Sequence, residues 1–195
     1  MIPRKYLDKL LSALQTALGG ALRAVYLTGS AAVGSYRRGT SDLDVLVAVD
    51  GAERAALERV VASCAHDVLP CPATKLELVV YTVDALVAPG ARPRWSLNFD
   101  TGASVHHVGW EPDREPAHWF VLDLAFANRH AVPLLGPPAR TLIGDPGSDA
   151  VTRAFAEMLA WFEANEPQAL PVARTRAEQW RRTGTFVPKP GLPSA

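Results

Sequence analysis

The chain has 195 residues, enough for one domain with a sizeable core or for one domain with a small appendage. Its 20 basic and 20 acidic side chains balance, and a large nucleic-acid-binding surface normally needs a basic excess. Charged residues at Arg4, Lys5 and Asp8 exclude an ordinary signal peptide, and no uncharged stretch approaches the roughly 20 apolar residues that span a bilayer. We therefore predict a soluble, cytoplasmic protein without a membrane partner and with nucleic acid disfavoured as a partner.

The first half of the chain is predicted to alternate between helices and strands. Apolar residues recur with helical spacing in 6–18 and 52–68, and Gly19-Gly20 and Pro70 mark the ends of these helices. Short, mostly apolar runs at 24–27, 43–49 and 75–82 indicate strands. The run at 43–49 is apolar on both faces, which is typical of a strand covered on both sides.

The segment 88–117 is rich in proline and glycine, and we predict a long irregular lid or substrate-facing loop there. Aromatic side chains in such a loop either stack on a ligand or fix the loop to the core. They are Trp95, Phe99 and Trp110, and the segment also carries His106 and His107.

A helix is predicted at 117–130, and the cluster Gly144-Asp145-Pro146-Gly147 marks the best domain boundary in the sequence. Helical spacing then returns at 150–165 and 171–183. We therefore expect one domain at 1–147 and a short helical domain at 148–195.

Two carboxylates, Asp42 and Asp44, stand at the start of the strand that ends at Val49. Because strand side chains alternate between faces, both carboxylates point to the same side. Like charges so placed repel each other unless a cation lies between them. The pair therefore predicts a site for a hard metal ion such as Mg²⁺.

Two further features complete a constellation around this pair. The turn Gly29-Ser30 follows the preceding strand, and backbone N–H groups at such a turn can bind phosphate oxygens. Glu77 begins another strand that is otherwise apolar, and with Asp42 and Asp44 it can hold two divalent ions. Together these parts indicate phosphoryl-type transfer from a nucleotide.

The pattern of a hydrophobic residue, Gly-Ser, a spacer and Asp-x-Asp in a strand resembles the signature of the polymerase-beta-like nucleotidyltransferases. Five stretches further resemble the streptomycin/spectinomycin (aminoglycoside 3''-type) adenylyltransferases, namely AVYLTGSAAVG, SDLDVLVAV, LELVVY, AVPLLGPPA and RTGTFVPKP. The resemblance runs over nearly the whole chain. It implies an α/β (α+β) fold with a mixed β-sheet nucleotidyltransferase core flanked by helices, followed by a short all-α C-terminal segment.

The resemblance also implies an adenylyltransferase that moves AMP from ATP to a hydroxyl of a small cationic acceptor, an aminoglycoside-type antibiotic. Ser30 and Ser41 would contact the triphosphate. Asp42 and Asp44 would bind two Mg²⁺ ions, and Glu77 would act as a ligand and as the general base. Two basic residues of the C-terminal segment, Arg176 and Lys189, would reach the phosphates. The alternative for Arg176 is a position on a solvent-exposed helix face.

The chain departs from the family pattern in two places. Asp100-Thr101-Gly102 stands where relatives carry an aromatic residue, which Trp110 would have to replace, and the helical half is shorter than in relatives. We therefore expect either a homodimer that completes the acceptor cleft or a protein that adenylylates antibiotics poorly. The rival interpretations are a nucleotidyltransferase acting on a protein or RNA, as in toxin–antitoxin pairs, and a catalytically idle nucleotide-binding or interaction protein.

Overall fold

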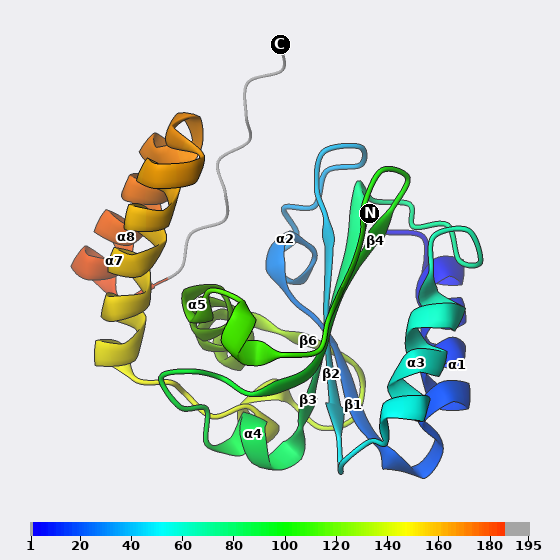
Figure 1. Cartoon of the computed structure of the whole chain (residues 1–195). Helices are drawn as coiled ribbons and strands as arrows, with labels where there is room; N and C mark the ends of the chain where they lie inside the picture. The colour runs from blue at the N-terminus through cyan, green and yellow to red at the C-terminus, as the bar shows by residue number, and fades with distance from the viewer. Residues whose placement is uncertain (1, 186–195) are drawn as a thin grey trace.

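A six-stranded mixed sheet with helices on both faces forms the centre of the computed structural model, which describes residues 2–185 (Figure 1). The strand order is β5-β4-β3-β2-β1-β6. Strands β2 and β3 run parallel, and their neighbours pair antiparallel. The predicted fold class, a mixed sheet flanked by helices, is confirmed.

The elements follow one another as helix–strand units in the first half and as mostly helices in the second. None of the helices formed by residues 2–185 is long and apolar enough to cross a membrane. The predicted strand at 75–82 and the predicted helix at 117–130 are confirmed with the same bounds. In chain order the elements are α1 Arg4–Leu18, η1 Gly19–Ala21, β1 Leu22–Leu27, α2 Gly29–Ala32, β2 Leu43–Val49, α3 Arg54–Cys64, β3 Lys75–Thr82, α4 Val83–Val87, β4 Trp95–Gly102, β5 His106–Gly109, η2 Pro112–Arg114, α5 Ala117–His130, β6 Val132–Leu135, α6 Ala139–Leu142, α7 Ser148–Asn165, η3 Pro167–Ala169 and α8 Leu170–Thr183.

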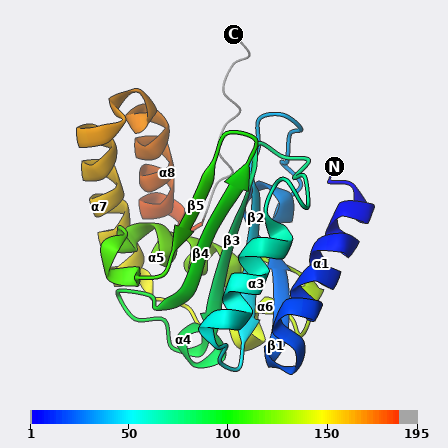
Figure 2. The same ribbon diagram turned by 45° about the vertical axis from the view of Figure 1, so that its right-hand side comes forward.

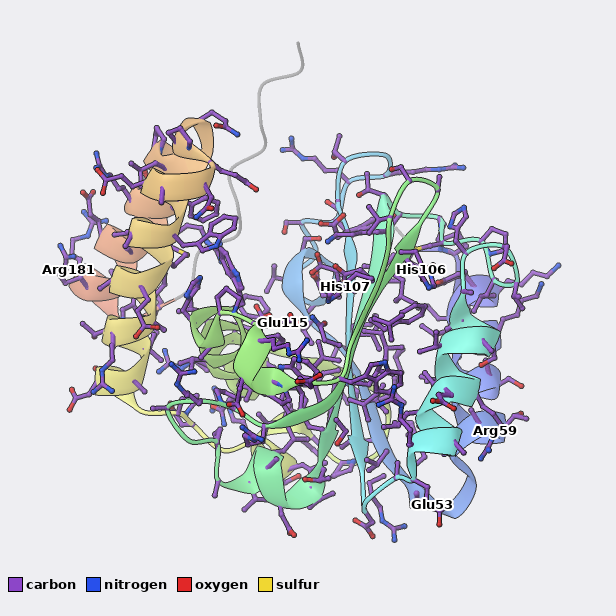
Figure 3. The ribbon with its side chains drawn as sticks, viewed as in Figure 1. Glu53, Arg59, His106, His107, Glu115 and Arg181 are labelled. Atoms are coloured by element: carbon purple, nitrogen blue, oxygen red, sulfur yellow. The ribbon has the colours of Figure 1, made fainter. Side chains whose placement is uncertain are left out.

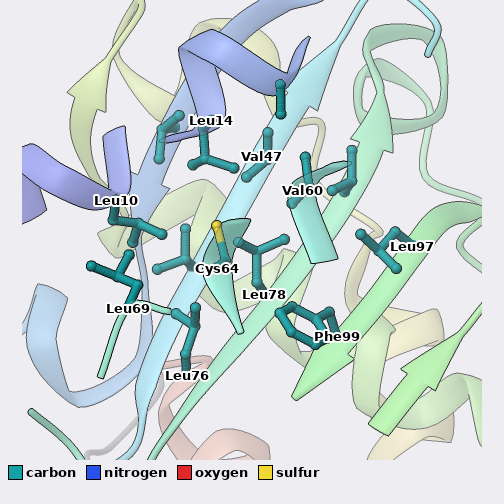
Figure 4. Close-up of a cluster of buried hydrophobic side chains, with 14 of the residues drawn as sticks. Leu10, Leu14, Val47, Val60, Cys64, Leu69, Leu76, Leu78, Leu97 and Phe99 are labelled. Atoms are coloured by element: carbon teal, nitrogen blue, oxygen red, sulfur yellow. The ribbon is translucent and has the colours of Figure 1, made fainter. Parts of the chain in front are cut away.

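Helices α1 and α3 cover one face of the sheet and build the largest apolar cluster (Figure 4). The alternation of side chains along the strands sends Val47 of β2, Leu78 of β3 and Phe99 of β4 to this face, where they are fully buried. Leu10 of α1 packs into the same cluster. The buried thiol of Cys64 also lies here, as a free cysteine.

Helix α5 covers the opposite face, and α7 and α8 pack on its far side (Figures 1 and 2). Leu46 of β2 and Tyr81 of β3 meet Phe120 of α5 in a second apolar cluster. A third cluster joins α5 to the C-terminal helices through Val121, Met158 and Trp180. The apolar stripes of α7 and α8 are therefore covered by α5 and by each other.

The segment 88–117 is not the irregular loop that we predicted, because it contains the hairpin β4–β5. Residues Trp95, Leu97, Phe99 and Thr101 are buried, and the residues between them are half-buried. This alternation of period two is typical of a strand, but the proline- and glycine-rich flanks conceal it. The hairpin extends the sheet beyond β3 and so forms one wall of the site described below.

Replacement of Leu78 by alanine tests the core that fixes β3. Leu78 is fully buried, so its truncation should lower the free energy of unfolding by about 3 kcal/mol through lost burial and a cavity. Val68 is 62% exposed and supplies the control, since Val68→Ala should change the value by less than about 0.5 kcal/mol. Urea titration measures both. Equal effects for the two variants would contradict the assignment of Leu78 to the core.

Candidate active site

Three carboxylates lie side by side on the sheet face that carries α5. The structure pairs Asp44 of β2 with Glu77 of β3, and Glu77 with Asp100 of β4. Residues paired directly across neighbouring strands point to the same face, so the three side chains form a row. His107 of β5 pairs with Asp100 and extends the row to the edge of the sheet.

The glycine turn after β1 lies directly against the first acid of the row. Gly29 has φ +56, and a Cβ atom built on it would lie 1.9 Å from Oδ2 of Asp44. The backbone N–H of Thr28 donates a hydrogen bond to the carbonyl oxygen of Asp44 at 3.0 Å. Only glycine therefore fits here, because it tolerates the positive φ and leaves room for the carboxylate. The two motifs singled out in the sequence meet at this point.

The two residues before β2 are fixed by hydrogen bonds to neighbouring loops. The hydroxyl of Thr74 donates to Oδ1 of Asp42 at 2.7 Å and also lies 2.8 Å from the carbonyl oxygen of Ser41. The backbone N–H of Arg37 donates to the hydroxyl oxygen of Ser41 at 3.0 Å. These bonds tie the approach to β2 to the approach to β3, which lies beside it.

The prediction that Asp42, Asp44 and Glu77 hold two divalent ions stays a prediction. Within residues 2–185, no group of three or more acidic, histidine or cysteine side chains is arranged to hold a metal ion. Thr74 bonds Asp42, and the ammonium of Lys75 lies beside Glu77. Magnesium usually binds one or two carboxylates together with phosphates and water, so Asp42 and Asp44 still fit such an ion.

Lys75 bridges the other two acids of the row. Its Nζ lies 2.5 Å from Oε1 of Glu77 and 3.2 Å from Oδ2 of Asp100, and the three side chains are 25%, 35% and 21% exposed. Burial alone would lower the pKa of Lys75, but the two carboxylates outweigh it and raise the pKa above its ordinary value. Burial and the charge of Glu77 raise the pKa of Asp100, which Lys75 opposes. Lys75 is thus protonated at neutral pH.

Arg176 of α8, predicted to reach the nucleotide phosphates, is directed to the same site. Its partly buried guanidinium has a pKa lowered chiefly by desolvation, while the carboxylates of Asp123 and Asp44 act in the opposite direction. Asp123 belongs to α5, so Arg176 lies within the electric field of both the sheet and this helix. Lys189 lies outside the described residues.

The histidine pair splits between the two faces of the hairpin (Figure 3). The rings of His106 and Phe99 are arranged in a T shape with their centres 5.7 Å apart, on the face covered by α1 and α3. His107 takes the other face, where its Nε2 lies 3.1 Å from Oε1 of Glu115. Asn98 donates to Oε2 of Glu115 at 2.7 Å, so this carboxylate is ordered and only 20% exposed. The carboxylate partner of His107 was not evident in the sequence.

Trp110 cannot replace the aromatic residue expected at the acceptor site. It packs on the α1–α3 cluster, with the guanidinium carbon of Arg54 3.4 Å from the centre of its ring. The carboxylate row faces the opposite side of the sheet. Aromatic side chains on that opposite side include Trp119 of α5. The ring centres of Trp161 and Phe162 of α7 lie 5.4 and 5.5 Å from that of Trp119.

Replacement of Gly29 by alanine tests the close packing of the turn against Asp44. Gly34 also has a positive φ, but a Cβ atom there would meet nothing within 4 Å. Gly29→Ala should therefore destabilise the protein by about 2 kcal/mol more than Gly34→Ala, since only the first adds a clash to the backbone strain. Thermal and urea unfolding of both variants measure the difference. The double variant Gly29→Ala/Asp44→Ala should recover most of it, and no recovery would show that the carboxylate is not the obstacle.

Comparisons with known proteins agree with this geometry. Residues 7–87 match the family model described as a nucleotidyltransferase domain, the segment that carries Gly29, Asp42, Asp44 and Glu77. No curated protein sequence matches the chain. The structure is similar to that of spectinomycin adenyltransferase AAD(9) from Enterococcus faecialis with ATP and spectinomycin, with a TM-score of 0.68 and 19% identity over 95% of this chain and 78% of that one. A toxin–antitoxin structure with AMP-PNP aligns with a TM-score of only 0.36, at 12% identity over 82% of this chain and 92% of that chain. Residues 7–87 thus match a nucleotidyltransferase domain, and the chain as a whole has a fold similar to that of the spectinomycin adenyltransferase structure.

Proposed function

We propose that the protein is a magnesium-dependent adenylyltransferase, which moves AMP from ATP to a hydroxyl of a small cationic acceptor of the spectinomycin or aminoglycoside class. The observation that carries the proposal is the contact of the Gly29 turn with Asp44, which is in register with Glu77, inside a nucleotidyltransferase domain. The choice of ATP and of the acceptor class follows the fold likeness to the spectinomycin enzyme.

The nucleotide would bind where β1 ends and β2 begins, at the α5 side of the sheet. Backbone N–H groups around Gly29 and Ser30, and the hydroxyl of Ser41, are the proposed phosphate contacts. Asp42 and Asp44 would hold Mg²⁺, which supplies positive charge for the phosphates when bound. Arg176 adds a fixed positive charge from α8, close to Asp44 and Asp123.

The reaction needs a base beside the acceptor hydroxyl. The hydroxyl oxygen would form a bond to the α-phosphorus as the bond from that phosphorus to the bridging oxygen of pyrophosphate breaks. Glu77 would take the hydroxyl proton, and pyrophosphate would leave with the electron pair. Glu77 suits this role because it is partly exposed and next to Asp44 on the same face.

Negative charge at the site favours a cationic acceptor. Among the acids that follow the hairpin, Asp113 pairs with Arg94 and Glu111 pairs with Arg114, on the exposed surface. Glu115 differs, because its ordered carboxylate lies on the hairpin face beside Asp100 and His107. We assign the attraction of the acceptor to Glu115 and the carboxylate row rather than to the outer acids.

The division into domains at 1–147 and 148–195 stays a proposal, and so does the homodimer. Helix α7 begins at Ser148, which agrees with the proposed boundary. Leu170 and Val172, two apolar residues at the start of α8, are half-buried. Phe186 and Leu192 lie outside the described residues. The apolar stripes of α7 and α8 are buried against α5 and against each other, so they do not need a second chain to cover them.

Replacement of Asp44 by asparagine should abolish transfer while the fold remains intact. The apoprotein should be no less stable, because the change removes a charge repelled by its neighbours. Pyrophosphate release with ATP, Mg²⁺ and a panel of spectinomycin, streptomycin and other aminoglycosides measures the activity. Asp8→Asn, at an exposed acid of α1, is the control and should behave as the wild type. A wild-type rate for Asp44→Asn would rule out the proposed role.

Replacement of Glu77 by glutamine separates binding from proton transfer. The amide cannot take the proton, so kcat should fall by about 10²-fold to 10⁴-fold while ATP still raises the melting temperature. Glu58→Gln, at an exposed residue of α3, serves as the matched control. If Glu77→Gln transferred AMP at the wild-type rate over a range of pH, the base assignment would be wrong.

A further inference from the structure

The row Asp44–Glu77–Asp100 contains more like charge than the sheet alone can stabilise. Like charges directly opposite each other on neighbouring strands destabilise a sheet, and here two such pairs share Glu77. In this chain the counter-charge is a side chain, Lys75.

Lys75 is placed between the two acids by the register of the sheet. It stands two residues before Glu77 on β3, so both side chains leave the same face of the strand. Its Nζ lies within ion-pair distance of both carboxylates, at 2.5 and 3.2 Å. All three groups are at least half withdrawn from water, so the pairing is screened less than on the surface.

The partner strand is built to admit the lysine. Gly102 of β4 pairs directly with Lys75, and a Cβ atom at Gly102 would lie 2.7 Å from the carbonyl oxygen of Thr74 and 3.1 Å from Cβ of Lys75. Any larger residue at 102 would therefore displace the base of the lysine side chain. Because Gly102 has no side chain, Lys75 keeps the position from which its Nζ reaches Glu77 and Asp100.

We propose that Lys75 is a built-in cation of the site, which occupies the position beside Glu77 that a second metal ion would otherwise take, and which holds Glu77 toward the acceptor. The proposal rests on the adenylyltransferase function above and refines it. The site would then bind one divalent ion, at Asp42 and Asp44, instead of the two expected from the sequence. In this proposal Lys75 is a positioning residue, because it acts through its ion pair with Glu77.

Metal stoichiometry tests the proposal without turnover. With Mn²⁺ and a non-hydrolysable ATP analogue, the wild type should bind one ion per chain and Lys75→Met should bind two. Without nucleotide, Lys75→Met should bind Mn²⁺ about tenfold more tightly, because an ammonium no longer repels the ion. Lys75→Arg keeps the charge and should bind one ion. Two ions in the wild type, or one ion in Lys75→Met, would overturn the proposal.

Kinetics test the positioning role. Lys75→Met should lower kcat by about 10²-fold with little change in the KM for ATP, because Glu77 is repelled from its place by Asp100. Lys75→Arg should recover part of kcat. The double variant Lys75→Met/Asp100→Asn should be less impaired than Lys75→Met alone, since it removes the repelling charge as well.

An exposed ion pair that flanks the hairpin, Arg94 with Asp113, supplies the matched control. Arg94→Met and Asp113→Asn, alone and together, delete a similar pair away from the carboxylate row and should leave kcat and Mn²⁺ binding unchanged. The positioning role of Lys75 would be contradicted by a wild-type kcat in Lys75→Met. It would also be contradicted if the double variant Lys75→Met/Asp100→Asn had a lower kcat than Lys75→Met. If the wild type released no pyrophosphate with any acceptor, the proposed function would fail, while the Mn²⁺ stoichiometry would still decide whether Lys75 replaces an ion. Should Lys75→Met not fold, Lys75→Gln removes the same charge and carries the same comparison.

Discussion

The ion pairs of Lys75 with Glu77 and Asp100 hold together a row of carboxylates that would otherwise repel one another across three strands. Such a row is tolerated because the opposite face of the same strands is packed against α1 and α3, which fixes their register. The charge arrangement and the core are thus two consequences of one alternation of side chains. Displacement of a single strand by one residue would bury the acids and expose the core.

Topology brings the acids to one end of the sheet. Strands β2 and β3 run parallel and are connected through α3. The acids near their starts, Asp44 and Glu77, therefore lie at the same end of the sheet. The antiparallel hairpin then adds Asp100 from the end of β4. Helix α5 and the C-terminal pair α7–α8 complete the surroundings, and Arg176 of α8 interacts electrostatically with both Asp44 of the sheet and Asp123 of α5. A rigid sheet and a charged helical wall therefore meet at one place.

The sequence predicted the local features well, because they depend on neighbouring residues. Alternation and the Asp-x-Asp pattern sufficed to place Asp44 and Glu77 near the starts of two strands. The hairpin at 95–109 was missed, although its buried residues alternate, because the glycine and proline around it resemble a loop. Because the hairpin was missed, the sequence also did not predict on which face of the sheet Trp110 packs. The direction of its side chain depends on the strand before it.

The role of Lys75 could not be read from the sequence for a different reason. Its partner Asp100 lies 25 residues away, and only the pairing of β3 with β4 brings the two together. Long-range register is set by the whole core, and a single sequence carries no direct signal for it. The same holds for Glu115, whose partners Asn98 and His107 come from two strands of the hairpin.

The most direct test of the account is a crystal structure with Mn²⁺ and a non-hydrolysable ATP analogue, in which anomalous scattering locates each metal ion. The account predicts one Mn²⁺ between the phosphates and the carboxylates of Asp42 and Asp44, with the phosphates beside Gly29 and the ammonium of Lys75 still between Glu77 and Asp100. A nucleotide bound elsewhere, or a second Mn²⁺ beside Glu77 with Lys75 turned away, would contradict it.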